Sequence, residues 1–295
     1  MRTVRTVAEL REALAPHRRA GRTIGLVPTM GAFHAGHLAL MRRARADTDV
    51  VVVSLFVNPI QFRPGEDLSA YPRDEAADAA EAAALGVDLL FAPAPEEVYP
   101  AGFATDVRVG TVTEPLEGAA RGPEHFHGVT TVVTKLFNMV GPDVAYFGQK
   151  DAQQVAVIRQ LVRDLDIPVG VEVCPTVRED DGLALSSRNR YLEGPDRERA
   201  AALSQALRAA EDAVHGGERD AAAIVAQARA ALAEHDVEPE YLELVSADTL
   251  APVERVGDAD VLVAVAARVG PARLIDNTIL LAAPPLSRGK SPRRQ

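Results

Sequence analysis

Apolar runs and amphipathic stretches alternate along the first 175 residues of the chain. Continuous apolar runs predict buried strands, and these lie at 23–27, 49–56, 87–91, 144–147 and 169–173. Between them, apolar residues recur at helical spacing at 37–46, 74–85, 129–140 and 153–164, and residues 1–21 add a short strand and an amphipathic helix. Because strands that are apolar throughout are typical of a covered parallel sheet, we predict an α/β fold, Rossmann-like, with helices on both faces.

The pattern changes after residue 175. Residues 176–192 show no regular period, and they are followed by helical stretches at 195–214 and 221–235 and by strand-like runs at 241–245, 261–269 and 272–281. We therefore predict a catalytic domain over residues 1–175 and a smaller α+β lid domain over residues 176–284. Residues 285–295 combine Pro, Ser and Gly with cations and contain no acid, so this tail is predicted to be disordered.

Composition narrows the class of protein. The hydrophobic fraction of 47% is ordinary for a globular chain, and no apolar run approaches the roughly 20 residues of a membrane span. A formal charge of −10 disfavours nucleic acid as a partner. The N-terminus lacks the apolar core of a secretory signal, and the lone Cys174 suits a reducing compartment. We expect a soluble cytoplasmic protein that handles small molecules.

The first candidate site lies at 28–37, where the chain leaves a strand and enters a helix. This position binds phosphate in many α/β proteins. The segment superficially imitates a P-loop, but His37 and Leu38 replace the obligatory Lys and Ser/Thr, and G-x-G-x-x-G is absent. His34 and His37 lie three residues apart at the predicted helix start, so both imidazoles should share one face and could donate to phosphoryl oxygens.

Two other interpretations of these histidines stay open on the sequence alone. They could be ordinary histidines at a helix start, or they could bind zinc together with His125 and His127. The second pair lies in a Gly-rich stretch at 121–128 that lacks a recognised zinc spacing. We therefore rank the zinc site low.

Two further clusters carry cationic chemistry. Lysine occurs at only three positions in this arginine-rich chain, and Lys150 is one of them, in the string Gly148-Gln149-Lys150-Asp151 that follows a predicted strand. A compact ammonium there suits a phosphate, although a solvated surface lysine is the alternative. The string at 185–190, Leu-Ser-Ser-Arg-Asn-Arg, could form a mobile anion clamp or an ordinary polar loop.

The three strings HxGH, GQKD and SSRN, in this order, resemble the pantothenate synthetase family of the HIGH-motif nucleotidyltransferase superfamily. Further matching stretches, such as 56–62, 71–73, 116–118 and 276–277, extend the resemblance from residue 25 to residue 282. It implies an ATP-dependent ligase that condenses pantoate with β-alanine through a pantoyl adenylate, releases AMP and pyrophosphate, and serves pantothenate and coenzyme A synthesis. It also implies Mg²⁺ with the ATP and a homodimer.

The resemblance assigns site residues position by position. The implied catalytic residues are His34, His37, Lys150 and Arg188, with His37 as proton donor. The implied ATP-binding residues are Met30, Gly31, Ala32, Phe33, His34, Ala35, Gly36, His37, Gly148, Gln149, Lys150, Asp151, Val177 (through its backbone), Leu185, Ser186, Ser187 and Arg188. Pantoate would contact Gln61 and Gln154 beside Pro28, Met30 and Phe147, and Gln61 would also help to place β-alanine. Further implied pocket positions are Asn58, Tyr71, Glu117 and Arg121, with Asp78 near the magnesium.

Three positions depart from the usual pattern of that family: Gln149, Leu185 and His127 stand where many members have Glu, Met and Arg. Two rival functions are considered. One is another HIGH-type adenylyltransferase of cofactor biosynthesis, and the other is a nucleotide-binding regulator without turnover. The implied chemistry needs positioning and positive charge rather than an enzyme nucleophile, so the absence of an obvious catalytic triad is expected.

Overall fold

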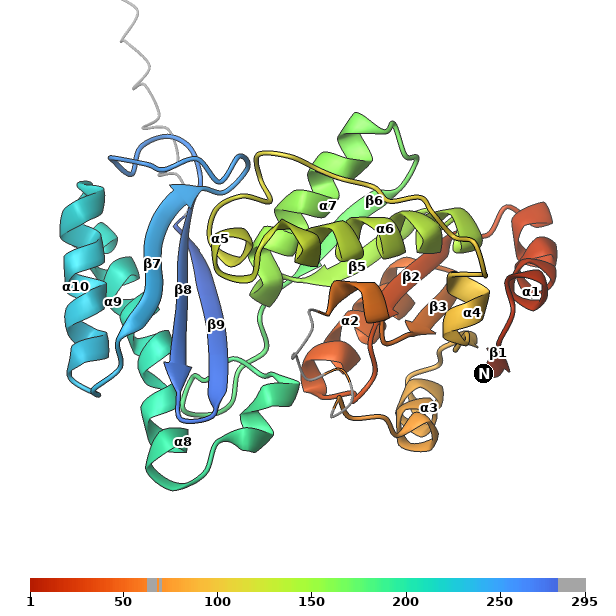
Figure 1. Cartoon of the computed structure of the whole chain (residues 1–295), viewed down its shortest axis with the longest axis horizontal. Helices are drawn as coiled ribbons and strands as arrows, with labels where there is room; N and C mark the ends of the chain where they lie inside the picture. Colours follow the sequence, from red (N-terminus) through yellow and green to blue (C-terminus); the bar gives the residue numbers. More distant parts are fainter. Residues whose placement is uncertain (63–67, 69–70, 281–295) are drawn as a thin grey trace, which may run out of the picture.

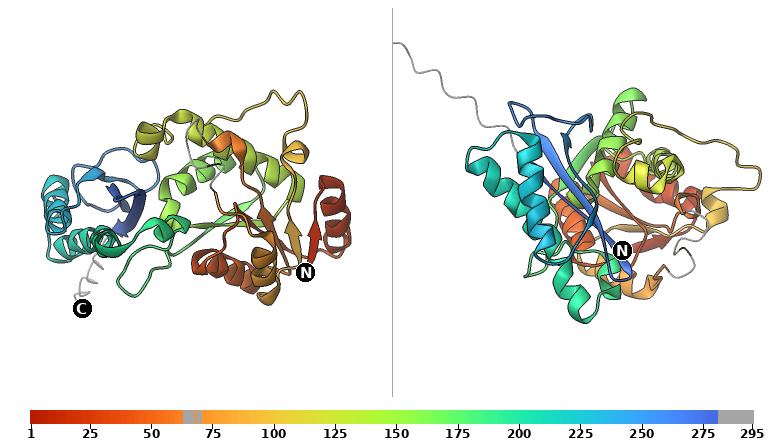
Figure 2. Two further views of the ribbon diagram at one scale, coloured as in Figure 1. Left: turned by 60° about the horizontal axis from the view of Figure 1, so that its bottom comes forward. Right: turned by 60° about the vertical axis from the view of Figure 1, so that its left-hand side comes forward.

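Two β-sheets organise the residues that the computed structural model describes, which are 1–62, 68 and 71–280. The larger sheet is parallel and has the strand order β1-β4-β3-β2-β5-β6, and the smaller one is antiparallel with the order β7-β8-β9. Figure 1 shows them side by side, and the two further views in Figure 2 preserve that arrangement. This architecture confirms the predicted α/β class with an additional α+β part.

The parallel strands carry apolar side chains on both faces. In β3, Val50 and Val52 pack into one hydrophobic cluster, whereas Val51 and Val53 pack into another on the opposite face. This two-sided burial explains why the sequence shows continuous apolar runs instead of alternation. The strands are β1 Arg2–Val4, β2 Ile24–Thr29, β3 Val50–Leu55, β4 Leu89–Phe91, β5 Val144–Gly148 and β6 Gly170–Cys174.

Helices cover both faces of the parallel sheet. The cluster on one face takes side chains from α1 (Val7–Arg19), α6 (Pro123–Val140) and α7 (Ala152–Asp164). The cluster on the other face takes them from α2 (Ala35–Asp47) and α3 (Glu75–Ala84). Within the described part of the chain, no helix has both the length and the hydropathy needed to cross a lipid bilayer.

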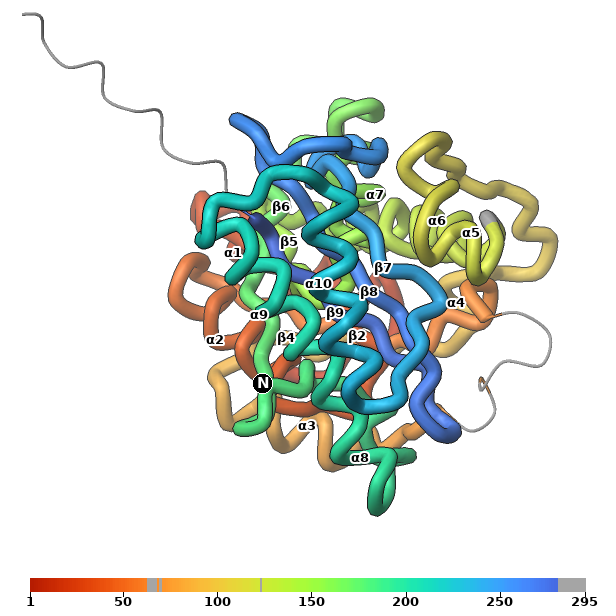
Figure 3. Tube along the Cα trace, turned by 90° about the vertical axis from the view of Figure 1, so that its left-hand side faces the viewer, coloured from red at the N-terminus to blue at the C-terminus, as the bar shows by residue number. Residues whose placement is uncertain are grey.

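The C-terminal part pairs helices with the antiparallel sheet. Its helices are α8 (Gly194–Ala200), α9 (Ala202–His215) and α10 (Ala221–Ala233), and its strands are β7 (Pro239–Ser246), β8 (Val261–Val269) and β9 (Ala272–Leu280). Figure 3 shows α9 and α10 over the outer face of this sheet. The opposite face contributes Val245 and Leu262 to the core of the parallel sheet, so the two parts share an apolar contact.

Several predicted boundaries were wrong. The single helix predicted at 195–214 is two helices that divide at Ala201, whose carbonyl accepts hydrogen bonds from both the N–H and the hydroxyl of Ser204. This hydroxyl competes with the regular backbone ladder. Helix α6 begins at Pro123, six residues before the predicted start at 129. No sequence pattern indicated α4 (Pro95–Val98) or α5 (Glu117–Arg121), which are too short for a helical period.

The predicted domain boundary at 175 falls just after β6, and it stays a prediction because the two parts share apolar contacts. Residues 281–284 and the predicted disordered tail at 285–295 lie outside the described residues, as does the last residue of the strand predicted at 272–281.

Candidate active site

His34 and His37 lie where β2 leads into α2. Gly31 and Ala32 adopt positive φ angles of 87° and 53°, which turn the chain sharply between the strand and the helix. His34 is the N-cap of α2, and its Nδ1 accepts a hydrogen bond from the N–H of Gly36 at 3.2 Å. Its proton is therefore on Nε2, which leaves an N–H donor for a ligand. The two ring centroids are 4.2 Å apart, as the three-residue spacing predicts.

Asp78 of α3 stabilises this turn through hydrogen bonds to its backbone. The buried carboxylate accepts hydrogen bonds from the N–H groups of Ala32 at 3.0 Å and Phe33 at 2.8 Å. A side chain at Gly31 would come within 2.9 Å of Asp78 Oδ2, so the turn and the carboxylate fit closely. Each oxygen thus accepts one backbone hydrogen bond, and the predicted place of Asp78 near a magnesium ion stays a prediction.

Burial keeps both histidines neutral at neutral pH. Burial first, with His34 and Lys150 contributing, lowers the pKa of His37 to about 3, whereas Asp151 opposes the shift. The pKa of His34 is also lowered, first by burial and then by the charge of Lys150. His37 Nδ1 is buried and has no hydrogen-bond partner among the described residues. In this state the pair offers N–H donors rather than positive charge, and a bound anion would raise both pKa values.

Lys150 occupies the turn η2 (Gln149–Asp151) that follows β5, as predicted for the carboxyl end of a parallel strand. Its side chain is 20% exposed, and its ammonium lies 3.5 Å from Asp151 Oδ1. The charges of both residues act on the pKa of His34 and His37, which places the first two predicted clusters in one electrostatic neighbourhood.

The third cluster lies in a loop that hydrogen bonds hold together, and its role as an anion clamp stays a prediction. The carbonyl of Val177 accepts a hydrogen bond from the N–H of Leu185 at 2.9 Å, which brings two of the implied ATP-binding residues together. Ser186 caps the short helix η3 (Ser187–Tyr191) by accepting from the N–H of Arg188 at 3.2 Å. Asn189 Nδ2 donates a hydrogen bond to the carbonyl of Ala184 at 3.0 Å, which stabilises the loop.

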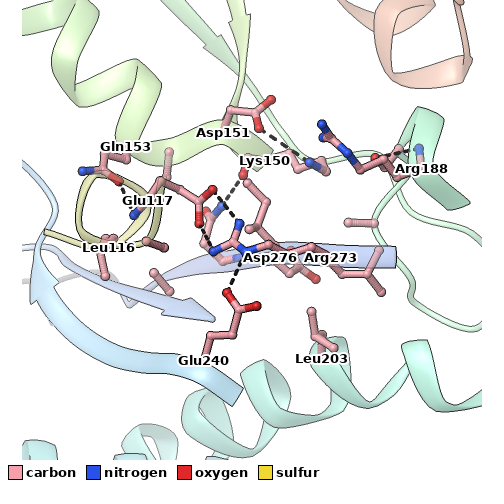
Figure 4. A pocket seen from close by; sticks show the side chains of 18 of the residues that line it. Leu116, Glu117, Lys150, Asp151, Gln153, Arg188, Leu203, Glu240, Arg273 and Asp276 are labelled. Carbon is pink, nitrogen blue, oxygen red and sulfur yellow. Dashed lines mark hydrogen bonds and ion pairs between the residues drawn. The ribbon is translucent and has the colours of Figure 1, made fainter. Parts of the chain in front are cut away.

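A cavity of about 790 Å³ lies between the two sheets, within the size range of ligand pockets. Figure 4 shows Lys150 and Arg188 extending into the same part of it. Its walls also include Gln154, Glu117, Arg121 and Ser186 among the predicted residues. His34, His37 and Gln61 do not line this cavity. Lys150 lines the cavity, and its charge acts on the pKa of both histidines, so they lie near the cavity. Gln61 contacts His125, which also lines the cavity.

Gln61 and Asn58 belong to a hydrogen-bonded group at the base of α6. Asn58 is 1% exposed, accepts from Tyr99 Oη at 2.8 Å, and donates to Gln61 Oε1 at 3.2 Å. It also donates to the carbonyl of Gly128 at 3.0 Å. A Cβ on Gly128 would come within 2.6 Å of the Gln61 backbone, so glycine inside α6 permits this close approach. The amide of Gln61 is thus held in place by neighbours.

The other pantoate positions are spread around this region. Pro28 and Phe147 lie near the ends of the neighbouring strands β2 and β5, and Phe147 is buried. Tyr71 is also buried, with its ring centroid 5.9 Å from that of Phe62.

The second histidine pair does not form a zinc site with the first. His125 and His127 lie in α6, because Pro123 starts the helix and Gly128 is accommodated within it. The ring nitrogens of His125 lie 3.1 Å from Arg121 Nη1 and 3.2 Å from the carbonyl of Gln61. No group of three or more His, Cys, Asp or Glu side chains within the described ranges could hold a metal ion.

Glu117 of α5 contacts the C-terminal sheet across the cavity. Its carboxylate accepts two hydrogen bonds from the Arg273 guanidinium, both at 2.8 Å, and one from Tyr241 Oη at 2.8 Å. Burial alone would raise the pKa of Glu117, but the hydrogen bonds and charge of Arg273, with help from Tyr241, hold it below the usual value. The backbone N–H of Glu117 donates to Gln153 Oε1 at 2.9 Å.

Sequence reasoning missed Arg273, Tyr241 and Gln153, and it named Asn277 only within the matching stretch 276–277, without a role. A usable signal existed on β9, where Arg273 and the pair at 276–277 interrupt an otherwise apolar strand.

A parallel sheet with a cationic cavity beyond its carboxyl ends, and a histidine pair at an adjacent helix start, defines an α/β enzyme that acts on a phosphate-bearing substrate. The profile of the pantoate-beta-alanine ligase family matches residues 2–279. The chain belongs to this family.

Similar proteins agree with the family assignment. The pantothenate synthetase of Cereibacter sphaeroides is 57% identical over 275 residues, which cover 93% of this chain and 98% of that protein. The crystal structure of pantothenate synthetase from Thermus thermophilus has a TM-score of 0.85 and 50% identity, and the alignment covers 94% of this chain and 99% of that one. The pantoate-beta-alanine ligase of Francisella tularensis, complexed with beta-gamma ATP and β-alanine, has a TM-score of 0.76 and 33% identity, covering 95% and 97%.

Proposed function

We propose that this chain condenses pantoate with β-alanine at the expense of ATP, through a pantoyl adenylate. The observation that carries the proposal is the cavity between the sheets, into which Lys150 and Arg188 extend from motifs of a ligase family that matches almost the whole chain. That match over residues 2–279 favours this ligase over other HIGH-type adenylyltransferases. A regulator without turnover would not need Lys150 and Arg188, and this chain has both.

The first half-reaction is adenylylation. A pantoate oxygen would attack the α-phosphorus of ATP in line while the bond to the bridging oxygen of the β-phosphate breaks and pyrophosphate leaves. The charges of Lys150 and Arg188 would balance the charge of the phosphates. The hydroxyls of Ser186 and Ser187 would donate hydrogen bonds to the phosphates. His34 and His37 would donate hydrogen bonds to phosphoryl oxygens as charge builds in the transition state. ATP would extend over the implied positions at 30–37, 148–151, 177 and 185–188.

The second half-reaction is acyl transfer. The amine of β-alanine would attack the acyl carbon of the mixed anhydride, AMP would leave, and the ammonium would lose its proton. Gln154 lines the cavity and Gln61 borders it, so their amides are suited to hold the carboxylate and hydroxyls of pantoate. The contacts of Glu117 across the cavity would help to exclude water, which would otherwise hydrolyse the anhydride.

ATP would enter as its Mg²⁺ complex, so the ion belongs to the substrate. Both oxygens of Asp78 accept backbone hydrogen bonds, so the proposal uses Asp78 to hold the turn before α2. The resemblance to the family further supports a cytoplasmic location and a homodimer. Analytical ultracentrifugation of the purified protein would test the homodimer.

The experiment follows the order of the two half-reactions. Purified protein with ATP, Mg²⁺ and labelled pyrophosphate should form labelled ATP only when pantoate is present. AMP should accumulate catalytically only after β-alanine is added, together with a product of the mass of pantothenate. Pyrophosphate exchange that is independent of pantoate, or exchange supported equally well by unrelated carboxylates, would contradict the proposal. The His37→Ala variant serves as the low-activity control.

A further inference from the structure

Asn277 connects the C-terminal sheet to the turn that carries Lys150. Its side chain is 4% exposed and accepts a hydrogen bond from Gln149 Nε2 at 2.9 Å. Its Nδ2 donates to the carbonyl of Gln149 at 3.0 Å and to the carbonyl of Lys150 at 2.8 Å. One buried amide thus uses its acceptor and both donors on two consecutive residues of η2.

The preceding residue of β9 binds Arg178, in the segment before the third motif. The carboxylate of Asp276, 3% exposed, accepts from Arg178 Nη1 at 2.6 Å and from Nη2 at 3.0 Å. Arg178 Nη1 also donates to the carbonyl of Gly182 at 3.0 Å, within the segment that leads to Arg188. The N–H of Asn277 donates to Asp276 Oδ1 at 2.8 Å, which ties the two side chains together. Of two adjacent residues of one strand, Asn277 therefore contacts the turn that carries Lys150, and Asp276 reaches the segment before Arg188 through Arg178.

The Lys150 side chain itself is held less firmly than its backbone. Its ammonium lies 3.5 Å from Asp151 Oδ1, which is longer than a charge-assisted hydrogen bond of about 2.8 Å. Where the ammonium lies in the cavity therefore depends on the backbone of η2. Asn277 holds that backbone from the opposite sheet.

We propose that Asn277 is a positioning residue for adenylylation, which fixes the backbone of Lys150 so that its ammonium meets the phosphates of ATP. Asp276 couples this turn to the segment that carries Arg188, and the two cations are thereby set relative to each other. The inference rests on the proposed role of Lys150. A purely structural contact between the sheets would affect both half-reactions, whereas this proposal predicts an effect on adenylylation only.

The test uses Asn277→Asp in the full-length protein. The carboxylate has nearly the same shape and still accepts from Gln149, but it cannot donate to the two carbonyl oxygens, which leaves buried acceptors unsatisfied. We expect kcat/KM for ATP in pantoate-dependent pyrophosphate exchange to fall about 10- to 100-fold. Transfer from preformed pantoyl adenylate to β-alanine should change less than about twofold, because the phosphates that Lys150 contacts have already left.

A double-mutant cycle shows whether Asn277 acts through Lys150. In the Lys150→Ala background, Asn277→Asp should have almost no further effect on ATP affinity, measured by isothermal titration calorimetry with a non-hydrolysable analogue. Thr278→Val is the matched control. It lies next to Asn277 on β9, and its hydroxyl bonds Glu211 of α9, away from the turn. This control should retain wild-type exchange.

Equal losses in both half-reactions, additive effects in the cycle, or a loss in Thr278→Val as large as in Asn277→Asp would overturn the proposal. If Asn277→Asp does not fold, Asn277→Ser retains one donor and should show a smaller loss of exchange, and unchanged exchange would also overturn it. A wild-type protein without pantoate-dependent exchange would instead refute the proposed function. The calorimetric cycle would still test Asn277 in that case.

Discussion

Replacing Arg273 by Met should destabilise the protein through Glu117, the carboxylate that it contacts across the cavity. The Glu117 side chain is 11% exposed and that of Arg273 20% exposed, and two hydrogen bonds of 2.8 Å join them. Removing one partner of a buried ion pair costs about 3–5 kcal/mol, because the other charge is left buried. Tyr241 still donates to Glu117 in the variant, so we take the lower limit, about 3 kcal/mol.

The assay is chemical unfolding of wild type, Arg273→Met, Glu117→Gln and the double variant, followed by circular dichroism. Arg273→Met should lose about 3 kcal/mol, which corresponds to a fall in the melting temperature of roughly 6 °C. The double variant buries no unpaired charge, so it should lose only about 1 kcal/mol. The loss of the double variant, compared with the sum of the two single losses, measures the interaction between the two side chains.

The pH dependence gives an independent check. In wild type the pKa of Glu117 is held low, so the ionised group stabilises the fold above its unfolded pKa of about 4.5 and loses this contribution as the pH falls through the lowered value. Without Arg273, burial should raise the pKa of Glu117 above its unfolded value. The stability deficit of Arg273→Met should then be larger at pH 7 than at pH 5. A deficit below about 0.5 kcal/mol at pH 7, or strictly additive single effects, would refute the reasoning.

Three other predictions concern the turn before α2. His37→Ala should slow pantoate-dependent exchange by about 10²-fold while the unfolding transition changes little, and an unchanged rate would exclude the assigned role. Because the pKa of His37 is lowered to about 3, the unfolded state binds the extra proton between about pH 3 and pH 6.5. Wild-type stability should therefore fall by up to about 1.4 kcal/mol for each pH unit from 6.5 downward, and His37→Gln should reduce this slope in parallel denaturation series. Asp78→Asn should lower kcat/KM for ATP about tenfold without changing the Mg²⁺ dependence, whereas a metal ligand would shift that dependence.

The parallel sheet was predictable because each of its strands is buried on both faces. Runs such as the one in β3 must be apolar at every position, which is visible without any knowledge of partners. Element ends were less predictable. The start of α6 depends on Gly128 fitting against the Gln61 backbone, and a glycine seen in isolation indicates a loop instead.

The site divides in the same way. The motifs that contain His34, His37 and Lys150 each begin where a strand ends. The carboxyl ends of parallel strands meet at one edge of the sheet, so local sequence suffices to associate these motifs. Arg273 contacts Glu117 at a sequence separation of 156, and Asn277 contacts Lys150 at a separation of 127. Contacts of that range leave no local pattern. The trace they leave is a polar residue or a short polar run in an apolar strand, which indicates buried partners without identifying them.

The cationic and the neutral donors suit different stages of the proposed reaction. Arg188 and Lys150 bring a guanidinium and an ammonium to the cavity, so they can balance the charge that ATP already has in the ground state. His37 and His34 are neutral in the free protein because burial lowers their pKa values, so they contribute little net attraction to an incoming anion. Their N–H dipoles respond most to charge that grows on the phosphoryl oxygens. Interactions that strengthen toward the transition state raise kcat, whereas uniform attraction lowers KM alone. A site with four permanent cations would bind ATP tightly and gain less rate, which accounts for histidines buried beside a lysine instead of two further arginines.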